Sequence, residues 1–233
     1  MNFLYLIVDL TALSVPLIFS FHPKIALHKK WLLLWPAILI STIPFIVWDS
    51  YFTRIGVWGF NPTYLLGHYL FGLPIEEILF FICIPYACLF TYFCFRIYLT
   101  DKFHLKYENL ITWIILLINV GLGIYFRDRY YTSYTATGLT IFLIFIRFVV
   151  KAKWLGLFYY SHMFLLVPFF IVNGVLTGTG LEKPIVWYNN AENMDVRLLT
   201  IPMEDVFYGM LMLLLNTFLF ELFMKKFSSD KTQ

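Results

Sequence analysis

The chain has 233 residues, of which 61% are hydrophobic and only 13% are charged, and its mean hydropathy is +0.76. Soluble domains are about half apolar and about a quarter charged, so this composition excludes a soluble domain and predicts an all-α polytopic membrane protein. The net charge is +3, and the basic residues lie in short loops rather than in one patch. We therefore expect the lipid bilayer, and no nucleic acid, as a partner.

Seven apolar runs are candidates for membrane-spanning helices, each of which needs roughly 20 mostly apolar residues. In chain order they are Phe3–Phe21, Trp31–Trp48, Pro74–Ile97, Asn109–Phe126, Tyr134–Val150, Trp154–Gly174 and Pro202–Met224. The first run has no basic stretch before it and no small-residue cleavage site after it, so it is expected to be a retained span. The three cysteines, all in the third run without CxxC spacing, indicate packing rather than metal or redox chemistry.

Basic residues predict the orientation, because cytoplasmic loops carry an excess of Lys and Arg. Twelve follow spans one, three, five and seven: Lys24, Lys29, Lys30, Arg96, Lys102, Lys106, Arg147, Lys151, Lys153, Lys225, Lys226 and Lys231. The opposite side has five: Arg54, Arg127, Arg129, Lys183 and Arg197. This bias places the N-terminus outside and the C-terminus in the cytoplasm of a cell membrane, the inner membrane where there are two. The long loops 49–73 and 175–201 then lie outside.

An internal repeat divides the chain. The stretch Pro74-Ile-Glu-Glu-Ile-Leu-Phe80 recurs as Pro202-Met-Glu-Asp-Val-Phe-Tyr208, and Trp58-Gly-Phe-Asn61 resembles Trp187-Tyr-Asn-Asn190. We predict two parallel three-helix repeats, residues 1–108 and 134–233, joined by a linker span within 109–133. Such a repeat has its axis along the membrane normal, so both acidic helix starts meet at one end of a common cleft.

Glu76, Glu77, Glu204 and Asp205 are the candidate catalytic residues. A proline and one acid in the first turn are ordinary helix-start chemistry, so capping is the competing interpretation. Two acids on each of two helices exceed what capping needs. In a dry cleft such carboxyls share protons, which supplies a proton donor and an ionised neighbour as base. Adjacent helical residues point about 100° apart, so one acid of each pair should face the cleft, but the sequence leaves open which one.

Aromatic residues near the acids are candidate substrate contacts, because ring faces stabilise a nearby cation. They are Trp58, Phe80, Phe81, Tyr86, Trp187, Phe207 and Tyr208. An acid above an apolar, aromatic-lined cleft favours protonation of a hydrocarbon. Four further polar residues are candidates for support of the acids: Asp49, Asn61, Asn173 and Arg197. Arg197 either pairs with an acid or is a loop cation.

Several classes are excluded by missing motifs. The chain has no GxGxxG for a nucleotide cofactor, no HxxxH or HExxH for a metal, and no DDxxD-like cluster for a magnesium–diphosphate. A retinal photoreceptor needs a Schiff-base lysine in its last span, and residues 202–223 contain none. The sequence therefore predicts no metal and no cofactor.

The repeated Pro-x-Glu-Glu/Asp motifs, each followed by aromatics, resemble the small integral-membrane lycopene β-cyclases. These occur as two subunits in some bacteria, as fused halves in others, and as the cyclase half of fungal bifunctional enzymes; this chain resembles the fused form. The resemblance implies an isomerase, or intramolecular lyase, that protonates the linear end group of lycopene and closes it to a β-ionone ring without redox change. It also implies that other enzymes of the carotenoid pathway are candidate partners.

Two alternatives stay open. A membrane carotenoid hydratase shares the first protonation but captures the cation with water. A proton-coupled transporter is the non-enzymatic alternative, since paired intramembrane acids and a parallel repeat are typical of carriers as well.

Overall fold

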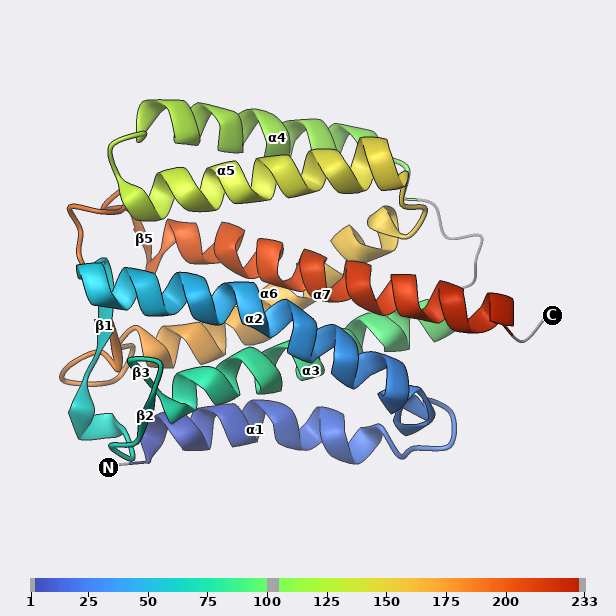
Figure 1. Ribbon diagram of the computed structural model, residues 1–233, viewed down its shortest axis with the longest axis horizontal. Coiled ribbons are helices and arrows are strands. Elements are labelled where there is room, and N and C mark those ends of the chain that lie inside the picture. The colour runs from blue at the N-terminus through green and yellow to red at the C-terminus, as the bar shows by residue number, and fades with distance from the viewer. Residues whose placement is uncertain (1–2, 100–104, 231–233) are drawn as a thin grey trace.

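The computed structural model describes residues 3–99 and 105–230, with side chains described as far as Phe227. Over these ranges the chain forms seven long helices that lie side by side along nearly one direction (Figure 1). They are α1 (Leu4–Phe19), α2 (Trp31–Ile55), α3 (Ile75–Tyr98), α4 (Glu108–Tyr125), α5 (Tyr130–Ile144), α6 (Leu155–Leu176) and α7 (Met203–Asp230). A π-helical turn, Phe145–Val150, continues α5.

Six of these helices are long and apolar enough to cross a membrane, over the part of the chain that the structure describes. The first helix, α1, has 16 residues and is shorter than the predicted span Phe3–Phe21, because the chain turns after Phe19. Many large apolar side chains lie on the outside of the bundle, among them Leu32 and Ile124. Such an apolar exterior suits lipid rather than water. The predicted class, an all-α polytopic membrane protein, is confirmed.

Six short strands form the loops at one end of the bundle, on the left in Figure 1. They are β1 (Trp58–Phe60), β2 (Tyr69–Leu70), β3 (Leu73–Pro74), β4 (Val186–Tyr188), β5 (Arg197–Leu198) and β6 (Ile201–Pro202). The β2–β3 and β5–β6 pairs are tight hairpins, whose turns place Phe71 and Leu199 at positive φ. Each hairpin leads directly into an acidic helix, α3 or α7.

The same contacts recur 128 residues apart. Asn61 N–H donates to Ile185 O and Asn189 N–H donates to Val57 O, both at 2.8 Å, so β1 and β4 pair antiparallel about Gly59 and Trp187. These contacts make Asn189, and not Asn190, the counterpart of Asn61. The predicted match of Trp58–Asn61 with Trp187–Asn190 was therefore wrong by one residue. The sequence match paired the two tryptophans, whereas the backbone hydrogen bonds make Asn189 equivalent to Asn61.

The two halves of the repeat interlock. Helix α3 packs on α1 of its own half and on α6 of the other, and α7 packs on α5 and α2 in the same way. Helices α1, α3, α5 and α7 all run in one direction, from the end with the strands to the opposite end (Figure 1). The acidic starts of α3 and α7 therefore lie at the same end. The domain boundaries themselves stay a prediction.

The basic loops lie at the other end. The turn that carries Lys24, Lys29 and Lys30 joins α1 to α2 there, on the right in Figure 1. Lys102 and Lys231, which contributed to the orientation, lie outside the described residues. The assignment of this end to the cytoplasm stays a prediction.

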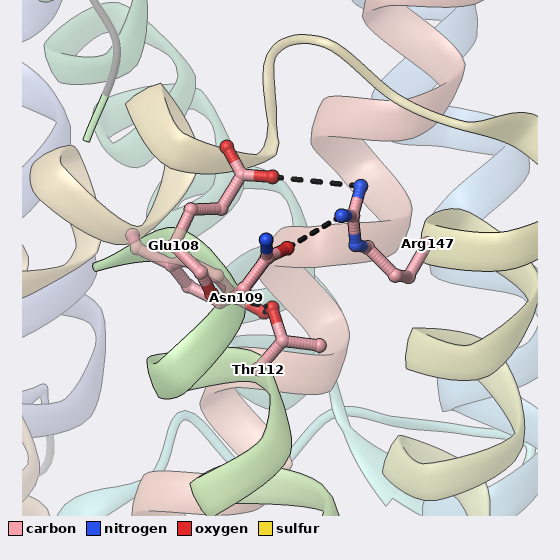
Figure 2. Close-up of polar contacts among 5 residues, drawn as sticks. Glu108, Asn109, Thr112 and Arg147 are labelled. Carbon is pink, nitrogen blue, oxygen red and sulfur yellow. Dashed lines mark hydrogen bonds and ion pairs between the residues drawn. The ribbon is translucent and has the colours of Figure 1, made fainter. Parts of the chain in front are cut away.

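The linker helix α4 is tied to the bundle by polar contacts at this same end (Figure 2). Arg147, in the π-helical turn, lies 3.7 Å from Glu108 Oε1 and donates to Asn109 Oδ1. Thr112 and the hydroxyl of Tyr159 share a hydrogen bond of 2.9 Å, which joins α4 to α6. These contacts fix α4 at the edge of the bundle, away from the acids of α3 and α7.

Candidate functional site

A cavity of about 330 Å³ lies between α1, α3, α6 and α7 and is closed at one end by β1 and β4. Its wall is mostly aliphatic and aromatic. Polar side chains gather at the end below the strands: Tyr5, Glu77, Tyr131, Asn173, Tyr188, Asp205 and Tyr208. The cavity continues along α3 from Glu77 to Thr91, which is about 21 Å at the rise of an α-helix. This is a long apolar slot with carboxyl groups at one end.

Glu77 is the acid of the first half that lines the cavity. Tyr5 Oη donates to its Oε2 at 2.5 Å, and the buried carboxyl of Asp49 lies within electrostatic range of it. Asp49 in turn accepts a hydrogen bond from Trp58 Nε1. Two buried carboxyl groups that lie near each other resist being ionised together, so we expect this pair to hold a proton.

Asp205 is the acid of the second half that lines the cavity, and its partners differ. It accepts hydrogen bonds from Tyr131 Oη at 2.5 Å, Asn173 Nδ2 at 2.7 Å and Tyr188 Oη at 3.1 Å. Burial, and then the charge of Asp205, raise the pKa of the β4 residue Tyr188 well above its ordinary value, so its phenol remains a donor at neutral pH. Three neutral donors stabilise negative charge on Asp205.

Glu76 and Glu204 do not line the cavity. Each accepts a hydrogen bond of 2.6 Å from a backbone N–H in its own loop, Leu66 for Glu76 and Met194 for Glu204. Thr132 Oγ1 also donates to Glu204 at 2.5 Å. The sequence left open which acid of each pair faces the cavity, and these contacts answer that question. The second acid of each motif faces the cavity, and the first holds the loop.

The predicted aromatic contacts separate into two groups. Trp58, Phe80 and Tyr208 line the cavity. The other four lie elsewhere: Phe81, Tyr86, Trp187 and Phe207. Phe81 and Phe207 pack into the core between helices. Tyr86 shares a hydrogen bond of 2.7 Å with Ser20 in a separate cluster, because it is about two and a half helical turns beyond Glu77, on the opposite face of α3, and faces α1 and α2. Trp187 is 44% exposed, since its strand position points away from the bundle.

The residues predicted to support the acids also separate. Asn173 contacts Asp205, and the buried carboxyl of Asp49 lies within electrostatic range of Glu77. Asn61 lies in the loop and accepts a hydrogen bond of 3.1 Å from Thr63 N–H. Arg197 donates to Thr200 O at 2.7 Å and to Asn190 Oδ1 at 2.9 Å, with its guanidinium above the Tyr188 ring. It binds its own hairpin and neighbouring loop rather than an acid, so the ion-pair interpretation was wrong.

Sequence reasoning missed Tyr5, Tyr131 and Tyr188, which donate to the two cavity acids, and two buried polar residues, Asp9 and His162. Tyr5 and Tyr131 occupy equivalent positions near the starts of α1 and α5, so an alignment extended over the first helix of each half would have found them. Both ring nitrogens of His162, which lines the cavity, lack a partner among the described residues.

The fold and the cavity define a polytopic membrane protein with an apolar, carboxyl-ended binding slot. The family model described as lycopene cyclase matches residues 2–95 and 128–223, and the chain therefore belongs to the lycopene cyclase family.

Curated relatives carry the name bifunctional lycopene cyclase/phytoene synthase. The chain is 32% identical to the one from Aspergillus oryzae over 91 residues, which are 37% of this chain and 16% of the relative. It is 37% identical to that of Arthroderma gypseum over 76 residues, 33% of this chain and 12% of the relative. It is 45% identical to that of Colletotrichum graminicola over 47 residues, which are 20% of this chain and 8% of the relative. The matches thus span less than a fifth of these proteins. No solved structure matches the chain.

Proposed function

We propose that the protein is a lycopene β-cyclase, an isomerase of carotenoid biosynthesis that closes the linear end groups of lycopene to β-ionone rings. The observation that carries the proposal is the pair Glu77 and Asp205, held at the closed end of a long apolar cavity. The slot suits a rod-shaped hydrocarbon, and the two acids supply the proton donor and the base that ring closure of an alkene needs. Family membership and the names of the relatives support the same substrate class.

Glu77 is the proton donor in this proposal. It lies near the buried carboxyl of Asp49, which disfavours its ionisation, and it is held by Tyr5, whereas Asp205 is stabilised as an anion by three neutral donors. Two carboxyl groups whose surroundings favour different protonation states in this way act as an acid and a base. Glu77 protonates the terminal double bond, and the neighbouring double bond attacks the resulting cation to close the ring.

Asp205 then removes a proton from the ring carbon next to the new cation, which forms the ring double bond. One proton enters and one leaves, and no electrons are transferred, so the reaction needs no cofactor. Trp58 and Tyr208 present aromatic rings to the cavity beside both acids, where they stabilise the carbocation. Phe80, which lies 6.3 Å from Tyr5 between ring centroids, extends this wall.

Hydration of the cation is the competing reaction at this site. Capture of the cation by water needs a water held beside it by polar groups. The hydroxyls of Tyr131 and Tyr188 and the amide of Asn173 donate to Asp205. Tyr208 Oη and both ring nitrogens of His162, however, line the cavity without a partner among the described residues, so the pigment assay decides between the two reactions. A transporter is disfavoured, because the acids lie at one end of a slot whose walls are otherwise mostly apolar.

The remaining features follow the sequence predictions. The protein would lie in the cell membrane with its acid end outside and its C-terminus in the cytoplasm. The chain would consist of repeats 1–108 and 134–233 with the linker span within 109–133. Other enzymes of the carotenoid pathway would supply lycopene and take up the product.

Expression in a bacterial host that accumulates lycopene tests this function. The pigments are separated by chromatography and identified by absorbance, with the protein confirmed in the membrane fraction. We expect γ- and β-carotene to replace lycopene, and the Glu77→Gln variant to leave lycopene unchanged. Unchanged lycopene with the wild-type chain would overturn the cyclase proposal, and hydroxylated products would replace it with the hydratase.

A further inference from the structure

A buried histidine marks the end of the cavity that lies away from the acids. His162, in α6, lines the cavity and is only 7% exposed. Both of its ring nitrogens are buried, and neither has a hydrogen-bond partner among the described residues. Buried polar side chains are nearly always hydrogen-bonded, and an unpaired one is costly, so packing alone does not explain this histidine. The missing partner has to be sought in the cavity that the ring lines.

His162 and the acids lie at opposite ends of the slot. Along α6, His162 is separated from Asn173, which donates to Asp205, by about 17 Å at the rise of an α-helix. On α3, Thr91 is the lining residue farthest from Glu77. The lining residues between these ends on α3 and α6 carry no nitrogen or oxygen in their side chains. The slot therefore has an acidic end and an imidazole end, which an apolar wall separates.

Ring contacts show that Thr91 and His162 belong to the same end of the slot. Phe95, one helical turn after Thr91, packs against Tyr160 and Phe164, at 5.2 and 5.0 Å between ring centroids. These two aromatic residues flank His162 along α6. The antiparallel helices α3 and α6 therefore meet at this level, and both contribute a polar side chain to the cavity wall.

The polar groups at this end match a hydroxyl group. The His162 ring is stacked on Phe158 at 5.6 Å between centroids, with 17° between the planes, which holds the ring and leaves its nitrogens unpaired. A neutral imidazole has one N–H donor and one acceptor nitrogen. Thr91 Oγ1 donates to Ala87 O at 3.1 Å, and its lone pairs can still accept. A hydroxyl group both donates and accepts hydrogen bonds, whereas a hydrocarbon does neither.

We infer that His162 and Thr91 form a subsite for a hydroxyl group, so that the slot accepts linear polyene alcohols as well as lycopene. The alkene end group of such a molecule lies at Glu77 and Asp205, and its terminal hydroxyl lies at His162. The chain has to match the slot, which extends about 21 Å along α3. Ring closure proceeds as for lycopene and leaves the hydroxyl unchanged. This inference rests on the proposed cyclase function, because it concerns the opposite end of the same slot.

Binding of apo-lycopenols, which are shortened lycopene chains that end in a primary alcohol, tests the subsite. Each alcohol is compared with the hydrocarbon of the same length that ends in a methyl group. Quenching of tryptophan fluorescence in detergent gives the dissociation constants, since Trp58 lines the cavity. We expect the alcohol of matching length to bind about tenfold more tightly than its hydrocarbon. Shorter and longer alcohols should lose this preference, because their hydroxyl group does not lie at His162.

Variants at the far end of the slot assign the preference to residues. His162→Leu should abolish it, and Thr91→Val should reduce it. His162→Gln keeps a donor and an acceptor and should restore most of it. Ser161→Ala is the matched control, because Ser161 is buried beside His162 in the chain but does not line the cavity, and it should behave like wild type. The preference is a ratio of two affinities of one variant, so a general change in packing cancels.

The possible results separate the subsite from the proposed function. Equal affinity of the wild-type chain for alcohol and hydrocarbon at every length would overturn the subsite, since water would then satisfy His162. A preference that persists in His162→Leu would overturn it as well. Ring closure of lycopene is measured separately by chromatography. A chain that prefers the alcohol through His162 but closes no rings would retain the subsite and lose the cyclase function. A chain that closes rings without this preference would do the reverse.

Discussion

Tyr131 donates its hydroxyl to Asp205 at 2.5 Å across 74 residues of chain, and this contact repeats the one that Tyr5 makes with Glu77. In each half the first helix thereby holds the acid of the third helix. The geometry is the same, but the further neighbour of Glu77 is the carboxyl of Asp49, whereas that of Asp205 is the amide of Asn173. Two similar halves thus give two acids with different chemical roles.

The Glu77→Gln variant should lose ring closure while the protein still reaches the membrane. Glutamine keeps the size of the side chain and can still accept from Tyr5, but it has no proton to give. General acid catalysis contributes about 10²–10⁴-fold, so a loss of kcat of this order is expected. Pigment conversion per unit of membrane protein measures it, and conversion at the wild-type rate would remove Glu77 as the donor.

The Asp205→Asn variant should fail at a different step. Asparagine can accept hydrogen bonds from Tyr131 and Tyr188, but it brings neither a negative charge for the cation nor a base for the ring proton. We expect kcat to fall by about 10²-fold or more with KM for lycopene nearly unchanged, since the hydrocarbon makes only apolar contacts. A large rise in KM alone would indicate a binding role instead.

The two tyrosines provide a paired test of which acid is charged. A hydrogen bond to an ionised group contributes about 1.5–3 kcal/mol, and one between neutral groups about 0.5–1.5 kcal/mol. Tyr131→Phe should therefore destabilise the protein more than Tyr5→Phe, because Asp205 is the proposed anion and Glu77 the proposed donor. Thermal unfolding of the two variants in the same detergent makes the comparison. A larger loss for Tyr5→Phe would reverse the assignment of acid and base.

The shape of the cavity can be tested away from the acids. Ala87 lines it on α3, so Ala87→Phe would place a ring in the slot without touching Glu77 or Asp205. We expect loss of lycopene conversion, with the protein still folded in the membrane. Leu10→Phe is the control, because Leu10 is half exposed on the outside of α1 and the larger side chain would meet lipid. Equal activity of the two variants would show that the substrate does not occupy this slot.

Much of the fold could be predicted because long apolar runs and basic loops are local properties of the chain. The repeated Pro-x-Glu-Glu/Asp motif also indicated which helices carry the acids. The choice of Glu77 over Glu76 could not be predicted, because it depends on how α3 is rotated against α1 and α6. Only the structure shows that Leu66 N–H donates a hydrogen bond to Glu76 Oε1.

The missed residues have a common cause. Tyr5 and Asp9 lie in the first apolar run, where a single polar letter carries no motif, and Tyr131 lies just before the predicted span Tyr134–Val150. The two tyrosines reach the acids only because α1 packs on α3 and α5 on α7. The aromatics were over-predicted for the opposite reason. Phe81 and Tyr86 are close to Glu77 along the chain, but they leave the helix on faces that point away from the cavity.

Glu204 gives the final test, because its proposed role is to hold a loop. Its Oε1 accepts from Met194 N–H at 2.6 Å and from Thr132 Oγ1 at 2.5 Å. Glu204→Leu removes both acceptor contacts and leaves buried donors unsatisfied, at a cost of about 1–3 kcal/mol for each. Glu204→Gln keeps an acceptor oxygen at the same place.

We therefore expect Glu204→Leu to lower the unfolding temperature clearly, and Glu204→Gln to retain both the stability and most of the activity. Thermal unfolding and pigment conversion, measured on the same membrane preparations, distinguish a loop support from a catalytic acid. If Glu204→Gln is stable but as inactive as Glu77→Gln, Glu204 takes part in the proton chemistry. Its isolation from the cavity would then have to be broken by a movement of the β5–β6 hairpin that precedes α7.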